Sequence, residues 1–192
     1  MNKKTISIQI DGVLRNSLEK ILEIYEAENE VSLERPLPSL NLEKELSFKS
    51  KEELIDFIYI ESPMRVFGNA KEIEDGGAYT LNEIYKKFRD DYKFLLFSNE
   101  IEKSKPATLL FLAKTGALID NISFYPLEDY GTIWEESDLI ISADTNILDS
   151  KPTDKISIKF TNEYNTNDES DKTINSLKDL LENDYFTRLE FA

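Results

Sequence analysis

The chain has 192 residues, with 38 acidic against 23 basic side chains, so its formal charge is −15. It contains neither cysteine nor histidine, which excludes a cysteine nucleophile, a zinc-thiolate site, a serine-histidine-aspartate triad and an imidazole proton switch. The acidic balance opposes binding to a phosphate backbone, and six glycines are too few for glycine-rich nucleotide loops. Any chemistry must therefore use carboxylates, lysines, hydroxyls or a hard cation.

No apolar run approaches the roughly 20 residues that a membrane-spanning helix needs. The N-terminal sequence Met1-Asn2-Lys3-Lys4 leads into an alternating segment rather than into the apolar core of a signal peptide. We therefore expect an intracellular protein, and its length favours one domain with a small insertion.

The first elements are predicted by two different apolar periods. Residues 5–10 alternate strictly and place Ile6, Ile8 and Ile10 on one face, which predicts a strand that ends at Asp11-Gly12. Apolar residues then recur at helical spacing after Asn16-Ser17, which predicts a capped amphipathic helix to about residue 29.

The next segment is expected to be a helical insertion. Residues 30–48 lack either period and predict an irregular segment. Two capping-box patterns follow, at residues 50–53 and 80–83, and each is expected to begin a helix. We therefore expect residues 30–92 to form a small helical cap between the first and second strands.

The second half alternates between buried strands and helices. Strands are predicted at residues 94–97, 121–125, 138–141 and 155–160, with a helix over 104–113 and a helical turn over 145–149 between them. Apolar runs buried on both faces and separated by helices are typical of a parallel sheet. The expected fold class is α/β, a Rossmann-like three-layer sandwich with a mainly parallel sheet.

Residues 161–192 are expected to form a polar loop, a helix and an aromatic tail. The loop spans residues 161–172, and the helix is predicted from a stripe that begins at Ile174. Four large apolar side chains then stand in the tail, where end segments seldom need them unless they pack against something. They belong either to this domain's own core or to a contact with another chain: Tyr185, Phe186, Leu189 and Phe191.

The informative residues are those at which each predicted strand ends, because an open parallel sheet places ligands beyond those ends. After the first strand the sequence reads Gln9-Ile10-Asp11-Gly12-Val13-Leu14. This segment resembles the first motif, Asp-x-Asp-Gly-Val-Leu, of the haloacid dehalogenase-like hydrolases, and most of all of their deoxyribonucleotidase-like branch. The resemblance covers most of the chain in element order, but its specific residues lie only at strand ends.

The resemblance implies phosphoryl transfer through an aspartyl-phosphate. The motif's first aspartate attacks phosphorus, and the second protonates the leaving group. Gln9 occupies the first position, and a carboxamide cannot form that intermediate and gives Mg²⁺ at best a weak ligand. Asp11, the second acid, is retained.

The remaining motifs of the family are matched in part. Ser98 fits the hydroxyl that orients a phosphoryl oxygen, and Lys105, or less well Lys114, fits the lysine that neutralises the phosphate. The acids that close a later strand and hold Mg²⁺ are replaced by Ser142 and Ala143, with Asp144 one residue late.

Structural roles compete with each of these assignments. An Asp-Gly pair is a common turn after a strand. Ser98 could satisfy a helix amide instead, and both lysines could be solvated surface side chains.

Two functional hypotheses of different class follow. The replacement of the family's acids by Gln9, Ser142 and Ala143 predicts a catalytically inactive, degenerate domain. Such a domain is expected to act as a structural or interaction protein without metal or cofactor. The alternative is a weak Mg²⁺-dependent phosphatase or nucleotidase, in which Asp11 and Asp144 hold the ion.

The segment 138–165 resembles haloacid dehalogenase-like proteins that tailed phages encode, and the Lys, Asn, Ile and Glu bias suits an AT-rich phage or its host. This resemblance implies a virion component near the portal or tail, present in the cytoplasm of the bacterial host and in the virion. The expected partners are other protein subunits, with no direct binding to nucleic acid or membrane.

Overall fold

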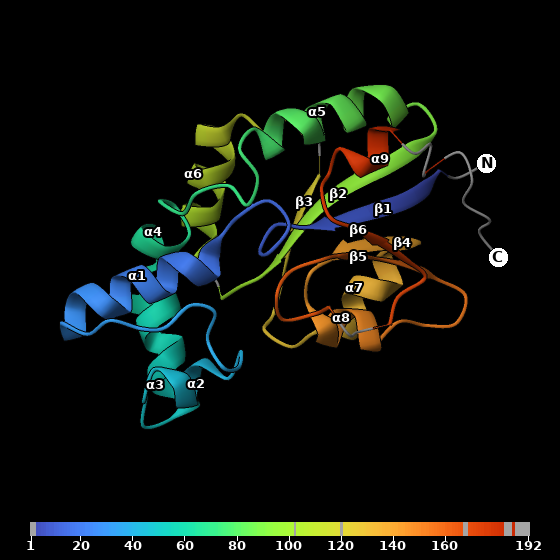
Figure 1. Ribbon diagram of the computed structural model, residues 1–192. Coiled ribbons are helices and arrows are strands. Elements are labelled where there is room, and N and C mark those ends of the chain that lie inside the picture. Colours follow the sequence, from blue (N-terminus) through green and yellow to red (C-terminus); the bar gives the residue numbers. More distant parts are fainter. Residues whose placement is uncertain (1–2, 102, 120, 167–168, 183–185, 187–192) are drawn as a thin grey trace.

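The computed structural model of the chain describes residues 3–101, 103–119, 121–166, 169–182 and 186. Six of its strands form one sheet, with every neighbouring pair parallel, in the order β3-β2-β1-β4-β5-β6 (Figure 1). The parallel sheet confirms the predicted α/β, Rossmann-like class. The strands are β1 (Lys4–Gln9), β2 (Tyr92–Asn99), β3 (Ile122–Tyr125), β4 (Leu139–Ser142), β5 (Ile156–Phe160) and β6 (Lys172–Ile174).

The order of the strands reverses beside β1, which lies between β2 and β4. Ligands of open parallel sheets bind at such a switch point, beyond the carboxyl ends of the strands. The register pairs Ile8 of β1 with Ile141 of β4. The next residues along the two strands, Gln9 and Ser142, therefore end side by side at the switch point.

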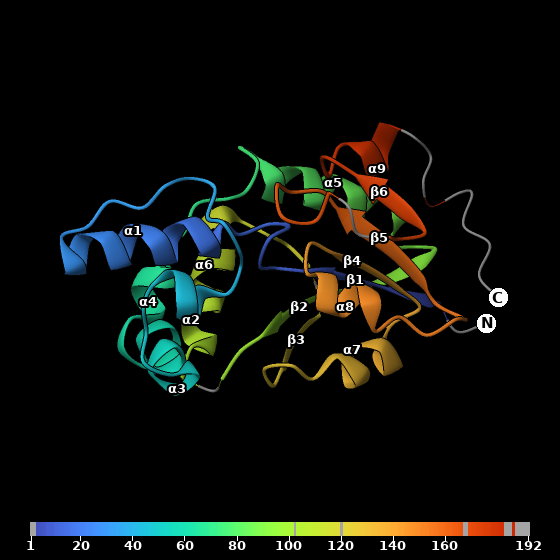
Figure 2. The same cartoon turned by 60° about the horizontal axis from the view of Figure 1, so that its bottom comes forward.

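Helices cover both faces of the sheet. On one face, α5 (Gly77–Phe88), α6 (Lys105–Thr115) and α9 (Asp179–Glu182) pack on a core that contains Ile6, Ile8 and Leu81. On the other, α7 (Tyr130–Glu136) and α8 (Thr145–Asp149) enclose Trp134, whose indole N–H donates to the Ile147 carbonyl (2.9 Å). Figures 1 and 2 show the sheet between these two helical layers.

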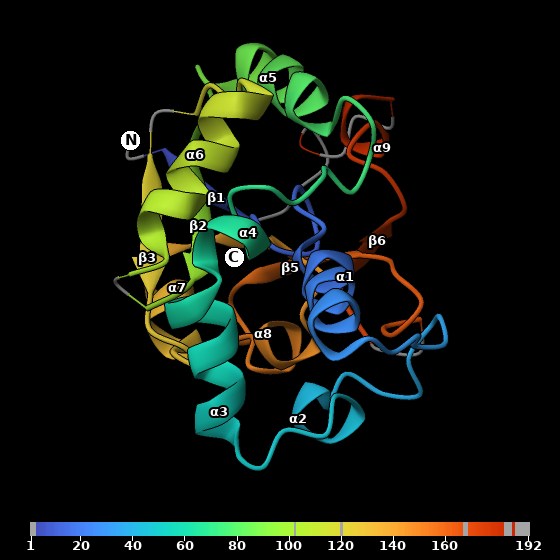
Figure 3. The same ribbon diagram turned by 90° about the vertical axis from the view of Figure 1, so that its left-hand side faces the viewer.

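A separate group of helices lies beyond the carboxyl ends of the strands (Figures 1 and 3). We call it the helical cluster. It comprises α1 (Ser17–Asn29), α2 (Leu42–Glu45), α3 (Lys51–Ile55), the π-helix η1 (Asp56–Glu61) and α4 (Pro63–Val66). Its own apolar core includes Leu22, Phe57 and Val66, and α6 adds Ala107 to it. The helical cluster thus packs partly on α6, one of the helices that cover the sheet.

The division of the chain into a main domain and a cap of residues 30–92 stays a prediction. The two apolar cores, however, do not follow the bounds of that cap. The helix α1 precedes residue 30 and packs Leu22 into the helical cluster. The helix α5 lies within 30–92 and packs Leu81 and Ile84 against the sheet. The reason is that the apolar side chains of α1 face the core of the helical cluster, whereas those of α5 face the core on the sheet.

The predicted start of a helix at Thr80 is wrong. The helix α5 begins at Gly77, after Gly76 with a φ of +78°. Thr80 lies inside the helix, where its hydroxyl donates to the Gly76 carbonyl (3.3 Å) instead of capping. The glycine pair starts this helix because glycine accepts a left-handed backbone without strain.

Further elements were not predicted, among them two helices and one strand. The short α2 lies within the segment expected to be irregular, and α7 lies between two predicted strands. Ile174, assigned from its spacing to a helix, ends the strand β6 and is fully buried. The described residues contain no helix with the length and apolar character to cross a membrane.

In the aromatic tail, Phe186 packs into the domain's own core. Its side chain is 1% exposed, and its ring centroid lies 4.8 Å from that of Phe88 and 6.2 Å from that of Phe94. The backbone carbonyl of Phe186 accepts a hydrogen bond from the Tyr92 hydroxyl (2.8 Å). Of the two roles open for the tail, Phe186 takes the core role, while Tyr185, Leu189 and Phe191 lie outside the described residues.

Replacing Phe186 by alanine should therefore destabilise the domain. Loss of the buried ring should lower the free energy of unfolding by about 3–5 kcal/mol, measured by urea denaturation. The matched control is Tyr79→Ala, because Tyr79 is 69% exposed on α5, and it should change stability by less than about 0.5 kcal/mol. Equal effects of the two substitutions would show that Phe186 is not part of the core.

Candidate functional site

The candidate site lies at the carboxyl ends of β1, β2 and β4, the edge that the helical cluster faces in Figure 3. The turn after β1 depends on Gly12, whose φ is +82° and whose Cβ, if present, would lie 3.0 Å from that of Ala143. The Gly12 N–H donates to the Arg15 carbonyl (2.9 Å). The turn thereby holds Arg15 close to Asp11.

Gln9, at the nucleophile position of the resemblance, is bound to the end of β4. Its side-chain oxygen accepts hydrogen bonds from the Ser142 hydroxyl (2.6 Å) and from the Ala143 backbone N–H (3.3 Å). Because a backbone N–H can only donate, these contacts fix the oxygen toward β4. The carboxamide nitrogen of Gln9 is thus turned away from β4.

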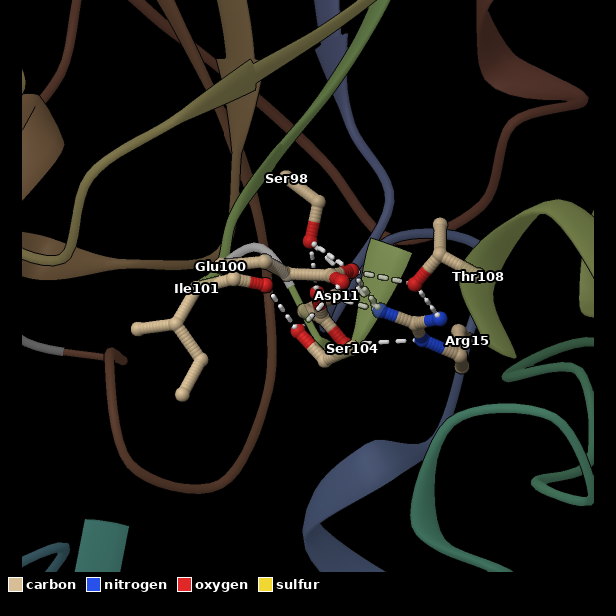
Figure 4. A network of polar contacts seen from close by, with 7 residues as sticks. All are labelled: Asp11, Arg15, Ser98, Glu100, Ile101, Ser104 and Thr108. Atoms are coloured by element: carbon tan, nitrogen blue, oxygen red, sulfur yellow. Dashed lines mark hydrogen bonds and ion pairs between the residues drawn. The ribbon is translucent and has the colours of Figure 1, made fainter. Parts of the chain in front are cut away.

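Asp11 is held by an arginine of the same chain (Figure 4). Arg15 donates from Nε to Oδ1 (2.9 Å) and from Nη2 to Oδ2 (2.8 Å), and the Ser98 hydroxyl also donates to Oδ2 (2.7 Å). This bidentate geometry is the strong form of a carboxylate-guanidinium pair.

The pKa of Asp11 follows from these contacts. Burial alone would raise the pKa of Asp11, but the charge and hydrogen bonds of Arg15, with that of Ser98, outweigh it and lower the pKa below its ordinary value. Asp11 is therefore ionised at neutral pH.

Arg15 is fully buried and is shared between two carboxylates. Its Nη2 also lies 3.1 Å from an oxygen of Glu100, whose side chain is fully buried too. The hydroxyls of Ser104 (2.8 Å) and Thr108 donate to Glu100 (Figure 4). The Ser98 hydroxyl also lies 2.8 Å from Glu100, so its single proton is shared between Glu100 and Asp11. Each carboxylate in this network thus has the charge of Arg15 and hydroxyl donors beside it, as buried charges require.

The network also contacts the helical cluster. The Arg15 guanidinium carbon lies 4.6 Å from the ring centroid of Phe67, which follows α4, and 5.5 Å from that of Phe111 on α6. Such distances are within the range of cation-π attraction. The buried charge therefore joins the strand ends to both groups of helices.

Of the predicted motif residues, Ser98 joins Asp11 and the two lysines do not. The Lys105 ammonium lies 5.6 Å from the ring centroid of Phe124, and Lys114 donates to the Gly68 carbonyl (3.0 Å). Within the described ranges, Arg15 is the cation that pairs with Asp11.

The end of β4 has the residues that were expected there. Ser142 and Ala143 end the strand beside Gln9, and the following Asp144 caps α8 by accepting from the Asn146 N–H (2.9 Å). Burial raises the pKa of Asp144, and its hydrogen bonds to Asn146 only partly offset this. Asp138 precedes the strand and binds Lys4 and Thr5 at the opposite end of the sheet.

The residues present do not fit a magnesium site. Mg²⁺ requires near-octahedral oxygen ligands and is held in proteins mainly by carboxylates. The oxygen of Gln9 is directed at β4, and both oxygens of Asp11 bind Arg15. No group of three or more carboxylates that could hold a metal ion occurs in the part of the chain that the structure describes.

A cleft of about 430 Å³ opens at this edge, between the helical cluster and the strand ends. Gln9, Asp11 and Asp144 line the cleft from the strand ends, and helices α1, α2 and α3 contribute its apolar wall. Lys51 of α3 forms an ion pair with Glu128, in the loop after β3, so the two sides of the cleft are joined.

Sequence reasoning missed Arg15 and Glu100, the residues that neutralise and surround Asp11. A signal for Arg15 was its position four residues after Asp11, directly behind the motif. A signal for Glu100 was a charged residue two positions after Ser98, where a buried strand ends. Neither signal specifies which charges pair, because the pairing depends on how β1, β2 and α6 meet.

No protein-family model matches the chain, and no curated protein matches it by sequence. Solved structures do match. A phosphonoacetaldehyde hydrolase-like protein from Oleispira antarctica has a TM-score of 0.62 and 8% identity, over 93% of this chain and 90% of that protein. YfnB from Bacillus subtilis, described as a HAD-hydrolase and solved with magnesium, has a TM-score of 0.56 and 12% identity, over 94% and 97% of the two chains.

CbbY from Rhodobacter sphaeroides, solved with phosphate, has a TM-score of 0.55 and 13% identity, over 93% of this chain and 96% of that one. These similarities show that the chain has the haloacid dehalogenase-like fold. The fold implied by the resemblance is thus confirmed, while identities this low address neither membership of the superfamily nor the subtype.

Replacing Arg15 by methionine should destabilise the protein strongly, since it leaves Glu100 buried without its counter-charge. We expect a loss of about 3–5 kcal/mol in the free energy of unfolding, measured by urea denaturation. Arg65→Met is the matched control, because Arg65 pairs with Glu28 at the surface and should contribute less than about 1 kcal/mol.

A second variant separates lost charge pairing from lost packing. In Arg15→Met with Glu100→Gln, the uncompensated buried charge is removed, so part of the lost stability should return. Equal losses for Arg15→Met and Arg65→Met would contradict the role given to the network.

Proposed function

We propose that this chain is a catalytically inactive protein on the haloacid dehalogenase-like fold, which acts by binding and not by phosphoryl transfer. The observation that carries the proposal is the bidentate pair between Arg15 and Asp11, beside a carboxamide at the nucleophile position. These contacts remove both chemical roles that phosphoryl transfer would assign to this strand end.

The residue at the position of the nucleophile cannot attack phosphorus. A carboxylate attacks phosphorus through an oxygen that carries negative charge, and the neutral carboxamide of Gln9 has none to offer. Its oxygen is in addition occupied by the Ser142 hydroxyl and the Ala143 N–H.

The general-acid role is equally unsupported. A general acid must be protonated before the reaction and works best with a pKa near the operating pH. Arg15 lowers the pKa of Asp11 below its ordinary value against the effect of burial, so the carboxyl has no proton to give at neutral pH.

The alternative, a weak Mg²⁺-dependent phosphatase or nucleotidase, requires Asp11 and Asp144 as ligands. Asp11 would have to leave Arg15, which would remove one of the two carboxylates that neutralise a fully buried guanidinium. Asp144 would have to leave the N-terminus of α8. Both costs favour the inactive assignment.

We extend the proposal to the protein's setting, a degenerate, phage-encoded member of the deoxyribonucleotidase-like branch that serves in the virion near the portal or tail. Its partners are then other protein subunits. This extension is supported by the resemblance of residues 138–165 to proteins of tailed phages and by a charge of −15, which disfavours DNA as a partner. Its absence from purified virions of the encoding phage would contradict the setting but not the inactivity.

The purified protein should not hydrolyse p-nitrophenyl phosphate or nucleoside monophosphates above background with Mg²⁺ at neutral pH. The measurement is phosphate release against a buffer blank. Turnover that disappears in Asp11→Asn would contradict the proposal and support the phosphatase alternative.

Restoring the carboxylate with Gln9→Asp should not by itself produce efficient turnover. Ser142 and Ala143 still supply no anionic ligand, and Arg15 still holds the second acid. Strong Mg²⁺-dependent hydrolysis by this single variant would show that another residue, such as Asp144, completes a working site.

A further inference from the structure

The cleft at the strand ends contains a hydrogen-bond donor that the protein itself does not use. Gln9 is only 7% exposed, and its side-chain oxygen is directed at Ser142 and Ala143. Its nitrogen, Nε2, has no hydrogen-bond partner among the described residues, and Gln9 lines the cleft. Nε2 is not one of the side-chain atoms buried without a partner, so this donor is open to the cleft, where a ligand can supply its acceptor.

The charges of the cleft disfavour an anionic ligand. Among the described lining residues, the carboxylates outnumber the ammonium groups: Asp11, Glu43, Glu128 and Asp144 against Lys51. Lys51 is itself paired with Glu128. A phosphate or carboxylate group entering here would meet repulsion and find no uncommitted cation.

The end of the cleft next to Gln9 does not favour a cation either. Asp11 is already neutralised by Arg15, Asp144 accepts from the N-terminus of α8, and Gln9 presents N–H groups and not lone pairs. Gln9 thus offers a donor for an uncharged acceptor oxygen, and Asn99 Oδ1, which is buried without a partner, offers an acceptor in the same cleft.

The opposite wall of the cleft is apolar. It includes Ile21, Leu54, Ile55 and Ile58 from the helical cluster, with Phe67 beyond them. The volume of about 430 Å³ is within the range of small-molecule sites, which combine an apolar lining with a few placed polar groups.

We propose that this cleft binds an uncharged small molecule with an apolar body and a carbonyl oxygen that accepts a hydrogen bond from Gln9 Nε2. The inference rests on the proposed function, because it uses Gln9 as a donor in place of a nucleophile. It adds the class of ligand, which differs from phosphate esters in carrying no charge.

The test uses prodan, an uncharged naphthalene dye whose single ketone oxygen reports hydrogen bonding and polarity by its emission. Prodan titrated into the full-length protein should bind with a blue-shifted emission. The sulfonated dye anilinonaphthalene sulfonate, which also contains a naphthalene ring, should bind at least about tenfold more weakly, which equals about 1.4 kcal/mol.

Variants assign the binding to this cleft. Gln9→Glu keeps the shape and the acceptor that faces β4 but replaces the donor with an oxygen, and it should weaken prodan binding at least about fivefold. Ile55→Ser should also weaken binding, because Ile55 lines the cleft. The matched control Ile60→Ser should leave the dissociation constant unchanged, since Ile60 is exposed on the adjoining η1 and is not among the lining residues.

Three results would overturn the inference: no prodan binding, binding that is insensitive to both Gln9→Glu and Ile55→Ser, or tighter binding of the sulfonate. If Gln9→Glu does not fold, the prodan dissociation constants of Ile55→Ser and Ile60→Ser decide whether the dye binds in this cleft. None of these results bears on hydrolysis of p-nitrophenyl phosphate, so failure of the ligand class and failure of the inactive assignment are distinguishable.

Discussion

The buried guanidinium of Arg15 is the constraint on which the rest of the site depends. A charge this far from water is tolerated only with counter-charges and hydrogen bonds around it. Asp11 and Glu100 provide the charges, and Ser98 and Thr108 extend the hydrogen bonds to β2 and α6.

These partners come from segments that are distant in the sequence, so the network fixes how they meet. The turn after β1, the end of β2 and the start of α6 all converge on one cation, and Phe67 brings in the helical cluster. An acid that would otherwise be available for chemistry is consumed in this structural role. Stability at the strand ends and catalysis at the same place therefore compete, and the contacts favour stability.

The orientation of the Gln9 carboxamide has one structural and one functional consequence. Its oxygen satisfies Ser142 and Ala143 across the switch point, which helps to join β1 to β4. The same contact turns its nitrogen away from β4 and leaves a donor at a position where a phosphatase needs a nucleophile. In the proposed function, the absence of a nucleophile and the presence of a ligand donor both follow from this residue and its orientation.

Local signals predicted most of the fold. The alternation at residues 5–10 and the apolar runs of β2, β4 and β5 specified strands correctly, because burial on both faces leaves a clear pattern. The start of α5 was missed because a threonine and a glutamate three residues apart resemble a cap even inside a helix. The strand β6 was missed because three residues at an edge carry too little periodicity.

The site was predictable where it depends on strand ends and not where it depends on pairing. Gln9, Asp11, Ser98 and Ser142 follow from counting residues to the end of each apolar run. The lysines could not be placed in this way, and Arg15 was not identified, because which cation reaches Asp11 is decided by the packing of α6 and the helical cluster.

The central claim is that Asp11 is ionised at neutral pH and bound to Arg15. The most direct measurement is a carbon-13 NMR titration of the Asp11 side-chain carboxyl, assigned by comparison with Asp11→Asn. The account predicts a titration midpoint below the ordinary value of 3.8, because Arg15 and Ser98 outweigh the effect of burial. A midpoint near or above that value would contradict it, since the carboxylate would then not be stabilised by the arginine against the effect of burial.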